Sequence, residues 1–183
     1  PSVFATRRWP EIAEKELKKY FNVTLNHGDK ALSNKELKDA FYNHDALAPT
    51  VSDTIDENII KSGKSGKGKI ISNYGVGFSH IDLEACQKYK IKVTNTPNVL
   101  TDATADLTIL LMLMVSRRSK EGEYQINNNL WPGWSPTHLL GSELTNKTLG
   151  IVGLGRIGQA VAKRAYFGFN MKIKFFNLSL IHI

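Results

Sequence analysis

Three glycines with the spacing of a dinucleotide-binding turn follow a short apolar segment, residues 149–152, and precede a helical pattern over 159–166. They are Gly153, Gly155 and Gly158. The order strand, Gly-x-Gly-x-x-Gly, helix distinguishes such a turn from a chance match. In this turn Gly153 permits the tight bend, Gly155 lets a pyrophosphate approach the backbone, and Gly158 lets the helix pack closely on the strand. The spacing therefore predicts a site for a phosphate-containing cofactor.

Backbone amides supply the chemistry of that site. The N–H groups of residues 154–157 lie at the positive end of the expected helix, which favours a phosphate anion. Arg156 adds positive charge there, although a solvent-facing arginine is the alternative interpretation. A second anion-binding loop is predicted at Gly75 and Gly77, which flank a strand end, because small residues let N–H groups converge on an anion. A plain turn is the alternative at this second position.

Composition and charge exclude several other functions. The 183 residues carry a net charge of +7, and their basic residues are densest over 61–69. No aromatic residue is interleaved there and no nucleic-acid-binding motif accompanies it, so we interpret 61–69 as a solvated, flexible loop and expect no nucleic-acid partner. The longest apolar run, 107–115, is too short to cross a bilayer, so no membrane interaction is expected.

The single cysteine, Cys86, excludes an internal disulfide framework and suits a reducing compartment. We expect it to be a small buried side chain rather than a nucleophile, because no histidine is near it in the sequence. No metal site is predicted, and we expect a cytoplasmic protein.

The first hundred residues alternate expected strands with expected helices, which predicts an α/β fold with an open parallel sheet and helices on both faces. The strands are expected at 3–6, 23–25, 46–48, 69–73 and 91–94, and the helices at 10–21, 34–41, 57–61 and 80–89.

A boundary is predicted at 95–98, followed by a long helix for which Thr101 is the expected N-cap. An irregular arm is expected over 122–141, and a last strand over 172–176. The apolar residues of the long helix that share one face are Ala103, Leu107, Leu110, Leu111 and Met114.

Four segments resemble the D-2-hydroxyacid dehydrogenase family, especially its glyoxylate and hydroxypyruvate reductases. They are residues 71–82, 95–106, 131–136 and 150–164, and the resemblance extends from Val3 to Asn177. It implies two Rossmann-like, doubly wound parallel-sheet domains with the active site in the cleft between them. Residues 1–97 would form a flavodoxin-like substrate domain, and 98–177 the N-terminal part of an NAD(P)-binding domain. Full-length relatives are usually homodimers through the cofactor domain.

The resemblance also implies the roles of individual residues. Val76 and Gly77 match the loop whose amides hold the substrate carboxylate, and Thr104 matches a position beside the nicotinamide. Trp134 matches an aromatic residue that relatives can present to a neighbouring subunit, with local packing as the alternative. The positions that match the pyrophosphate cradle and its glycines are Gly153, Leu154, Gly155, Arg156, Ile157 and Gly158.

The family's catalytic arginine, carboxylate and histidine lie beyond this turn, so none is expected in this chain, and we expect the chain alone to be inactive. Its own histidines, His27, His44, His80 and His138, are expected to be structural or solvated, and only His80 would approach the cleft. Residues 178–183 resemble the translation of a transposon-end sequencing adapter, which predicts a non-native tail, with a genuine continuation of the last strand as the alternative.

The choice of cofactor depends on the end of the last expected strand. An acidic residue there would bind the ribose of NAD, whereas Phe176 and Asn177 offer no carboxylate to repel the extra phosphate of NADP, so NADP is slightly favoured over NAD. The expected reaction is reduction of a small 2-oxo acid to its D-2-hydroxy acid. Two alternatives stay open: a dinucleotide-sensing corepressor of the same fold, and another family dehydrogenase such as phosphoglycerate dehydrogenase.

Overall fold

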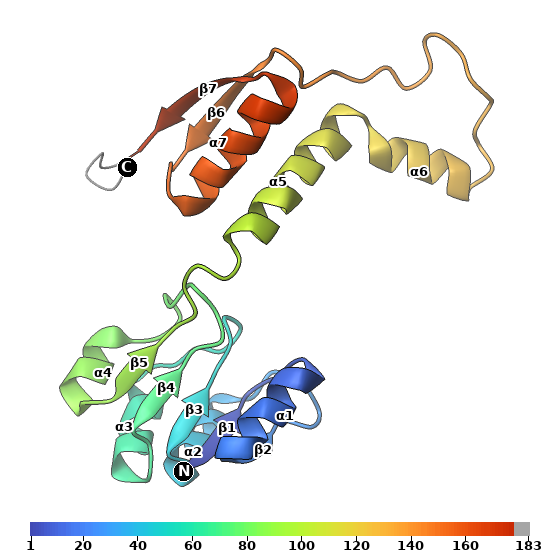
Figure 1. The fold of residues 1–183 in the computed structure, drawn as a ribbon. Helices are drawn as coiled ribbons and strands as arrows, with labels where there is room; N and C mark the ends of the chain where they lie inside the picture. The colour runs from blue at the N-terminus through green and yellow to red at the C-terminus, as the bar shows by residue number, and fades with distance from the viewer. Residues whose placement is uncertain (178–183) are drawn as a thin grey trace. The chain divides into compact units, whose positions relative to one another are not determined.

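The computed structural model describes residues 1–177 of the chain, which form two compact units that divide between Val99 and Leu100 (Figure 1). The expectation of a non-native tail at 178–183 lies outside the described residues. Over the described part of the chain, no helix combines the length and apolar character needed to cross a bilayer.

The first unit contains a sheet of five parallel strands in the order β2-β1-β3-β4-β5. The chain order reverses at β1, and a crevice opens at such a switch point beyond the carboxyl ends of the strands. This is the flavodoxin-like order expected from the sequence. The strands are β1 (Ser2–Ala5), β2 (Asn22–Leu25), β3 (Ala46–Ala48), β4 (Ile70–Ser72) and β5 (Lys92–Thr94).

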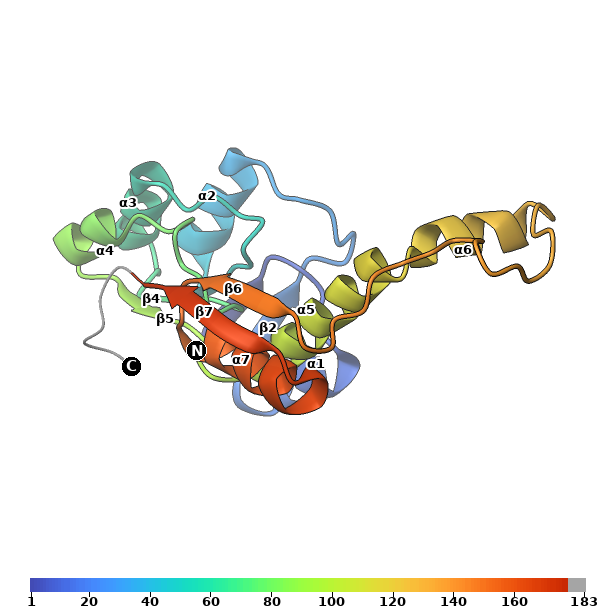
Figure 2. The same ribbon diagram turned by 90° about the horizontal axis from the view of Figure 1, so that it is seen from above.

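Helices cover both faces of this sheet, because successive strand residues point to opposite sides (Figure 2). Leu47 and Ile71 belong to the larger core, which α2, α3 and α4 close. Ala46 and Ala48 belong to the core on the other face, against which Leu17 of α1 packs. The helices are α1 (Glu11–Tyr20), α2 (Asn34–Asn43), α3 (Glu57–Ser65) and α4 (Leu83–Tyr89).

Side-chain caps determine where three of these helices begin. Ser33 and Glu36 form a reciprocal capping box at the start of α2. Asp56 accepts a hydrogen bond from the Ile59 amide at 2.9 Å and starts α3. Asp82 caps α4 in the same way, so this helix begins at Leu83 rather than at residue 80 as the sequence analysis expected.

The basic segment 61–69 is not a solvated loop over its whole length, as we had expected. Helix α3 continues to Ser65, and Gly63 is buried against the ring of Phe41. A Cβ atom at Gly63 would overlap that ring, so only glycine allows α3 to approach α2 this closely. The lysines are exposed, but the glycines among them serve packing.

The second unit pairs β6 with β7 in a parallel ladder, and α7 forms the crossover between them. Helix α5 packs on α7, and the guanidinium of Arg164 joins the two helices through Asp102 at 3.0 Å and Asp106 at 2.6 Å. The elements are α5 (Thr101–Ser116), α6 (Ser119–Asn127), β6 (Thr148–Val152), α7 (Arg156–Phe169) and β7 (Lys172–Phe176).

Two local expectations for the second unit are wrong. The N-cap of α5 is Leu100, not Thr101, and no side chain caps this helix. The segment 122–141 is not irregular throughout, because α6 continues to Asn127. Arg118, in the left-handed conformation, starts α6 and binds Glu121 through two hydrogen bonds of 2.8 and 2.6 Å. These contacts favour a helical turn that the polar sequence did not indicate.

Glu14 of α1 is a buried carboxylate that orders the chain after β1. Arg8 donates to its two oxygens at 2.7 and 2.8 Å, and the amide of Trp9 donates at 2.9 Å. These bonds, with that from Arg8 the largest cause, lower the pKa of Glu14 from 4.5 to about 2. The charged form of Glu14 is therefore the one that stabilises this loop.

We expect Glu14 to make stability depend on pH between 4.5 and about 2. Its folded pKa lies below its unfolded value, so the unfolded chain takes up the proton first as the pH falls. The stabilisation is fully present above pH 4.5 and is lost as the pH falls through the folded pKa. Glu14→Gln should therefore lower the Tm at pH 6 and flatten its dependence on pH, as measured by circular dichroism.

The matched control is Glu11→Gln on the same helix. Glu11 pairs with Lys15, but both side chains are largely exposed, so this substitution should leave the pH slope unchanged. An identical slope in the wild type and in Glu14→Gln would contradict the prediction.

Candidate functional site

Side-chain amides donate hydrogen bonds to the backbone carbonyls of the loop after β4. The carboxamide of Asn73 is buried at the end of β4, with the residue only 2% exposed. Its Nδ2 group donates to the carbonyl of Gly75 at 3.1 Å and to that of Gly77 at 2.8 Å. The Nδ2 group of Asn95, just after β5, donates to the carbonyl of Val76 at 2.9 Å. All three successive carbonyls therefore have donors.

The amides of the same loop are in the opposite situation. Within residues 1–177, no hydrogen-bond acceptor lies against the N–H groups of Val76 and Gly77. The backbone of this loop is anchored at its start, where the Tyr74 amide donates to the Pro49 carbonyl at 2.8 Å. Two neighbouring free N–H groups on a braced loop are an arrangement with which protein backbones can bind a carboxylate or a phosphate.

His80 contacts the side chain that braces this loop. Its Nε2–H group donates to Oδ1 of Asn73 at 2.9 Å. Burial lowers the pKa of His80, and the negative charge of Asp53 partly opposes this. Asp53 is itself buried and accepts from the Thr6 hydroxyl at 2.5 Å and from the Thr50 amide at 2.8 Å. Polar residues that follow β1, β3 and β4 thus meet at one edge of the sheet.

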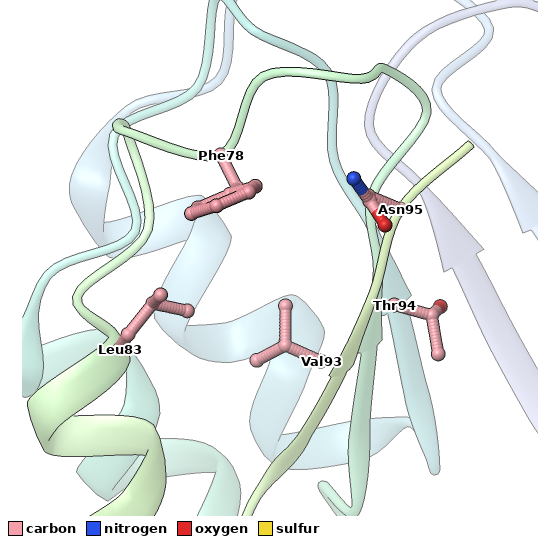
Figure 3. Close-up of a pocket in the computed structure, with 5 residues that line it drawn as sticks. All are labelled: Phe78, Leu83, Val93, Thr94 and Asn95. Atoms are coloured by element: carbon pink, nitrogen blue, oxygen red, sulfur yellow. The ribbon is translucent and has the colours of Figure 1, made fainter. Parts of the chain in front are cut away.

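A small apolar cavity of about 180 Å³ lies beside the same loop. Figure 3 shows Leu83 and Val93 pointing toward a common space below the ring of Phe78, while Thr94 points away on the other side of β5. On the chain after β1, Trp9 stacks on Tyr74 with ring centroids 5.1 Å apart. Apolar and aromatic side chains therefore flank the free amides.

The glycine turn of the second unit has the geometry that its spacing requires. Gly153 has φ +94°, a backbone conformation that residues with a side chain rarely adopt. Its amide donates to the carbonyl of Phe176 in β7 at 2.8 Å. A Cβ atom at Gly158 would overlap the Gly153 carbonyl oxygen, so this glycine permits α7 to approach the turn. A Cβ atom at Gly155 would meet nothing within 4 Å. The backbone at Gly155 is thus open to a ligand.

The start of α7 is suited to an anion. No acceptor within the described chain binds the amides of Gly155, Arg156 and Ile157, and the first turn of α7 contains no acidic residue. Arg156 is exposed and forms no ion pair with residues 1–177. Gln159 donates to the Leu154 carbonyl at 3.1 Å, so this carbonyl of the turn has a donor. Positive charge from the helix dipole and the guanidinium is therefore uncompensated here.

Thr104 and Trp134 lie elsewhere in the second unit. Thr104 is in the first turn of α5, where its carbonyl accepts from the Thr108 hydroxyl at 2.8 Å. Trp134 is 83% exposed in the arm between α6 and β6. The amide of Ser142 donates to the Ser116 carbonyl at 2.8 Å, so the chain returns to the end of α5 after passing through α6 and this arm.

Other chemically capable side chains have structural surroundings. Cys86 is buried, and desolvation raises the pKa of its thiol to about 11, which makes a nucleophilic role unfavourable. The ring nitrogens of His44 lie 2.8 Å from the Ala40 carbonyl and 3.0 Å from the Thr24 hydroxyl. Among residues 1–177, no group of three or more histidine, cysteine, aspartate or glutamate side chains could hold a metal ion.

Sequence reasoning missed the side chains that brace the two loops. Asn73 and Asn95 were assigned only to a strand and a boundary, and Gln159 only to a helix. Asparagine at a strand end was the available signal, but it does not indicate which carbonyl the side chain will bind. His80 was placed near the cleft without a partner.

Fold and site together define a protein of doubly wound α/β units, one with a braced loop that presents two free amides and one with a dinucleotide-type glycine turn. The family model for D-isomer specific 2-hydroxyacid dehydrogenase, catalytic domain, matches residues 3–174. The chain belongs to this family, which confirms the resemblance drawn from its motifs.

Individual relatives agree with the family. The chain is 44% identical to glyoxylate reductase of Thermococcus litoralis over 181 residues, covering 97% of this chain and 54% of that protein. It is 42% identical to glycerate dehydrogenase of Hyphomicrobium methylovorum over 168 residues, covering 92% and 52%. The crystal structure of the TT0316 protein from Thermus thermophilus is similar with a TM-score of 0.92 at 41% identity, covering 100% of this chain and 58% of that one. The chain spans about half the length of the curated relatives it matches.

Proposed function

We propose that this chain supplies the substrate-carboxylate loop and the coenzyme turn of an NAD(P)-dependent D-2-hydroxyacid dehydrogenase. The reaction is reduction of a small 2-oxo acid, glyoxylate or hydroxypyruvate, to the D-2-hydroxy acid. The observation that carries this proposal is the pair of free amides at Val76 and Gly77 on a loop in which the carbonyls of residues 75–77 all accept hydrogen bonds. The names of the two relatives above, glyoxylate reductase and glycerate dehydrogenase, contain a small 2-oxo acid and a small 2-hydroxy acid.

The free amides of Val76 and Gly77 bind the carboxylate of the substrate. Two N–H donors on adjacent residues suit one carboxylate, because an ionised acceptor forms stronger hydrogen bonds than a neutral one. Since Asn73 and Asn95 hold the carbonyls of the loop, the amides are oriented before the substrate arrives. Such preorganisation reduces the cost of ordering the loop on binding.

The residues at the start of α7 fit the pyrophosphate of NAD(P). The open backbone at Gly155, the free amides of the first turn and the unpaired Arg156 together provide space, donors and positive charge. When bound, the coenzyme supplies the hydride for the reduction. Thr104, which matches the nicotinamide position, belongs to the same unit, and Arg164 fixes its helix on α7.

We propose NADP as the preferred coenzyme, with NAD as the less favoured one. Strand β7 ends at Phe176, and Asn177 follows, so no carboxylate stands where one would bind the ribose of NAD and repel a 2′-phosphate.

A substitution at Gly155, compared with one at Gly168, distinguishes an effect on coenzyme binding from an effect on folding. We expect Gly155→Ala to weaken NADPH binding at least about tenfold, or ~1.4 kcal/mol, because the new methyl group occupies the approach of the pyrophosphate. Gly168→Ala is the matched control: it lies in α7, the helix that Gly155 precedes, and its Cβ atom also meets nothing within 4 Å. The measurement is NADPH titration by fluorescence. Equal affinities for the two variants would contradict this assignment.

The proposed reaction itself is tested on the longer protein of which this chain would be a part. We expect that protein to oxidise NADPH in the presence of glyoxylate. The measurement is the decrease in absorbance at 340 nm. The 183-residue chain alone should give no turnover. We propose that the arginine, carboxylate and histidine that the family uses for substrate binding and proton transfer lie outside it. Turnover by the isolated chain would overturn this division of roles. Coenzyme binding without turnover in the longer protein would favour a dinucleotide sensor.

We further propose that the longer protein is a homodimer through α5. The exposed fractions of Leu107, Leu110 and Leu111 are 53%, 51% and 53%, which leaves an apolar helix face uncovered within the second unit. Leu111→Glu should therefore shift the protein from dimer to monomer in analytical ultracentrifugation. Ile12→Glu, at an 80% exposed residue of α1, is the control and should leave the mass unchanged. A dimer that survives Leu111→Glu would exclude this face.

A further inference from the structure

We propose that His80 is a positioning residue for the substrate-carboxylate loop, acting through the carboxamide of Asn73. His80 donates from Nε2 to Oδ1 of Asn73 at 2.9 Å, and Asn73 in turn donates to the carbonyls of Gly75 and Gly77 at 3.1 and 2.8 Å. The functional meaning of this inference rests on the proposed role of Val76 and Gly77 in binding the substrate.

His80 is needed to select the orientation of the Asn73 carboxamide. A carboxamide can be rotated by half a turn with little change in shape, which exchanges its acceptor and its donors. In the reversed orientation Oδ1 would face the carbonyl oxygens of Gly75 and Gly77. Both would lose the Asn73 donor, and Gly75 would keep only the Thr96 amide at 3.0 Å. Asn73 is 2% exposed, so solvent has little access to compensate for such losses. The donor on His80 selects the orientation in which all three groups are satisfied.

The backbone of His80 is held firmly enough to perform this selection. Its carbonyl accepts from the Ile55 amide at 2.8 Å, and the next residue, Ile81, forms a parallel bridge with Ile55. The amide of Asp82 donates to the Ile55 carbonyl at 3.0 Å. Hydrogen bonds on both sides of Ile55 thus fix the place from which the imidazole reaches Asn73.

The role does not depend on the charge of His80. Both the neutral tautomer protonated at Nε2 and the imidazolium donate from Nε2. What matters is an N–H group at this position. A glutamine side chain can present such a group, whereas an alanine or a leucine cannot.

The first test follows the Asn73 carboxamide in the ligand-free 183-residue chain by NMR. In His80→Ala, we expect hydrogen exchange of its side-chain amide protons to accelerate about fivefold, as the loss of one hydrogen bond implies. In His80→Gln, exchange should remain within about twofold of the wild type, because the donor is retained. If His80→Ala does not fold, His80→Leu fills the space without offering a donor. Equal exchange in wild type and the donor-less variant overturns the inference, as does acceleration in His80→Gln equal to that in His80→Ala.

The second test titrates oxamate, a small carboxylate analogue of a 2-oxo acid, and follows the amide resonances of Val76 and Gly77. We expect oxamate to bind about fivefold more weakly to His80→Ala than to the wild type, while His80→Gln binds normally. If the wild type does not bind oxamate, the proposed carboxylate site fails, but the exchange measurement still decides whether His80 orients Asn73. If oxamate binds all variants equally, the site stands and the positioning role of His80 is wrong.

Discussion

The buried carboxamide of Asn73 is the interaction on which the first unit's binding loop depends. A buried polar side chain must find partners for its donors and its acceptor, since unsatisfied groups are costly away from water. Asn73 finds them in two carbonyls of its own loop and in the ring of His80. This arrangement turns the loop so that its carbonyls point inward and its amides remain available. The anion binding that we propose for this loop would thus be a consequence of hydrogen-bond satisfaction behind it.

The second unit reaches the same chemistry by a different route. At the start of α7, amides are free because every helix leaves its first N–H groups without intrahelical acceptors. The backbone of the turn can approach this helix only because Gly158 has no side chain to meet the Gly153 carbonyl. Both candidate sites therefore use backbone N–H groups rather than charged side chains as their main donors. Arg156 adds charge at the edge of the second site but does not build it.

Periodicity was sufficient to predict the larger part of the fold. Strands β3 and β7 begin and end at the residues expected, because short apolar runs between turns have few alternative pairings. The glycine turn and the loop around Gly77 could be located from residue types alone. Helix ends were less accurate: α3 extends past residue 61 because Gly63 packs on Phe41, a contact between residues distant in the sequence. The start of α6 depends instead on a local pair, Arg118 and Glu121, three residues apart.

The sequence by itself determined the chemical types present: glycines where backbones must come close, amide-rich turns after strands, and the motifs of a dehydrogenase family. Tertiary structure alone decided which groups satisfy one another. Asn73 and His80 meet through the fold of the connection between β4 and α4, and Asn95 reaches Val76 because the parallel sheet brings the ends of β4 and β5 to the same edge. Hydrogen bonds are short-ranged and directional, so their partners depend on distances that the folded backbone defines. That is why the glycines of the sites were predictable and the side chains that brace them were not.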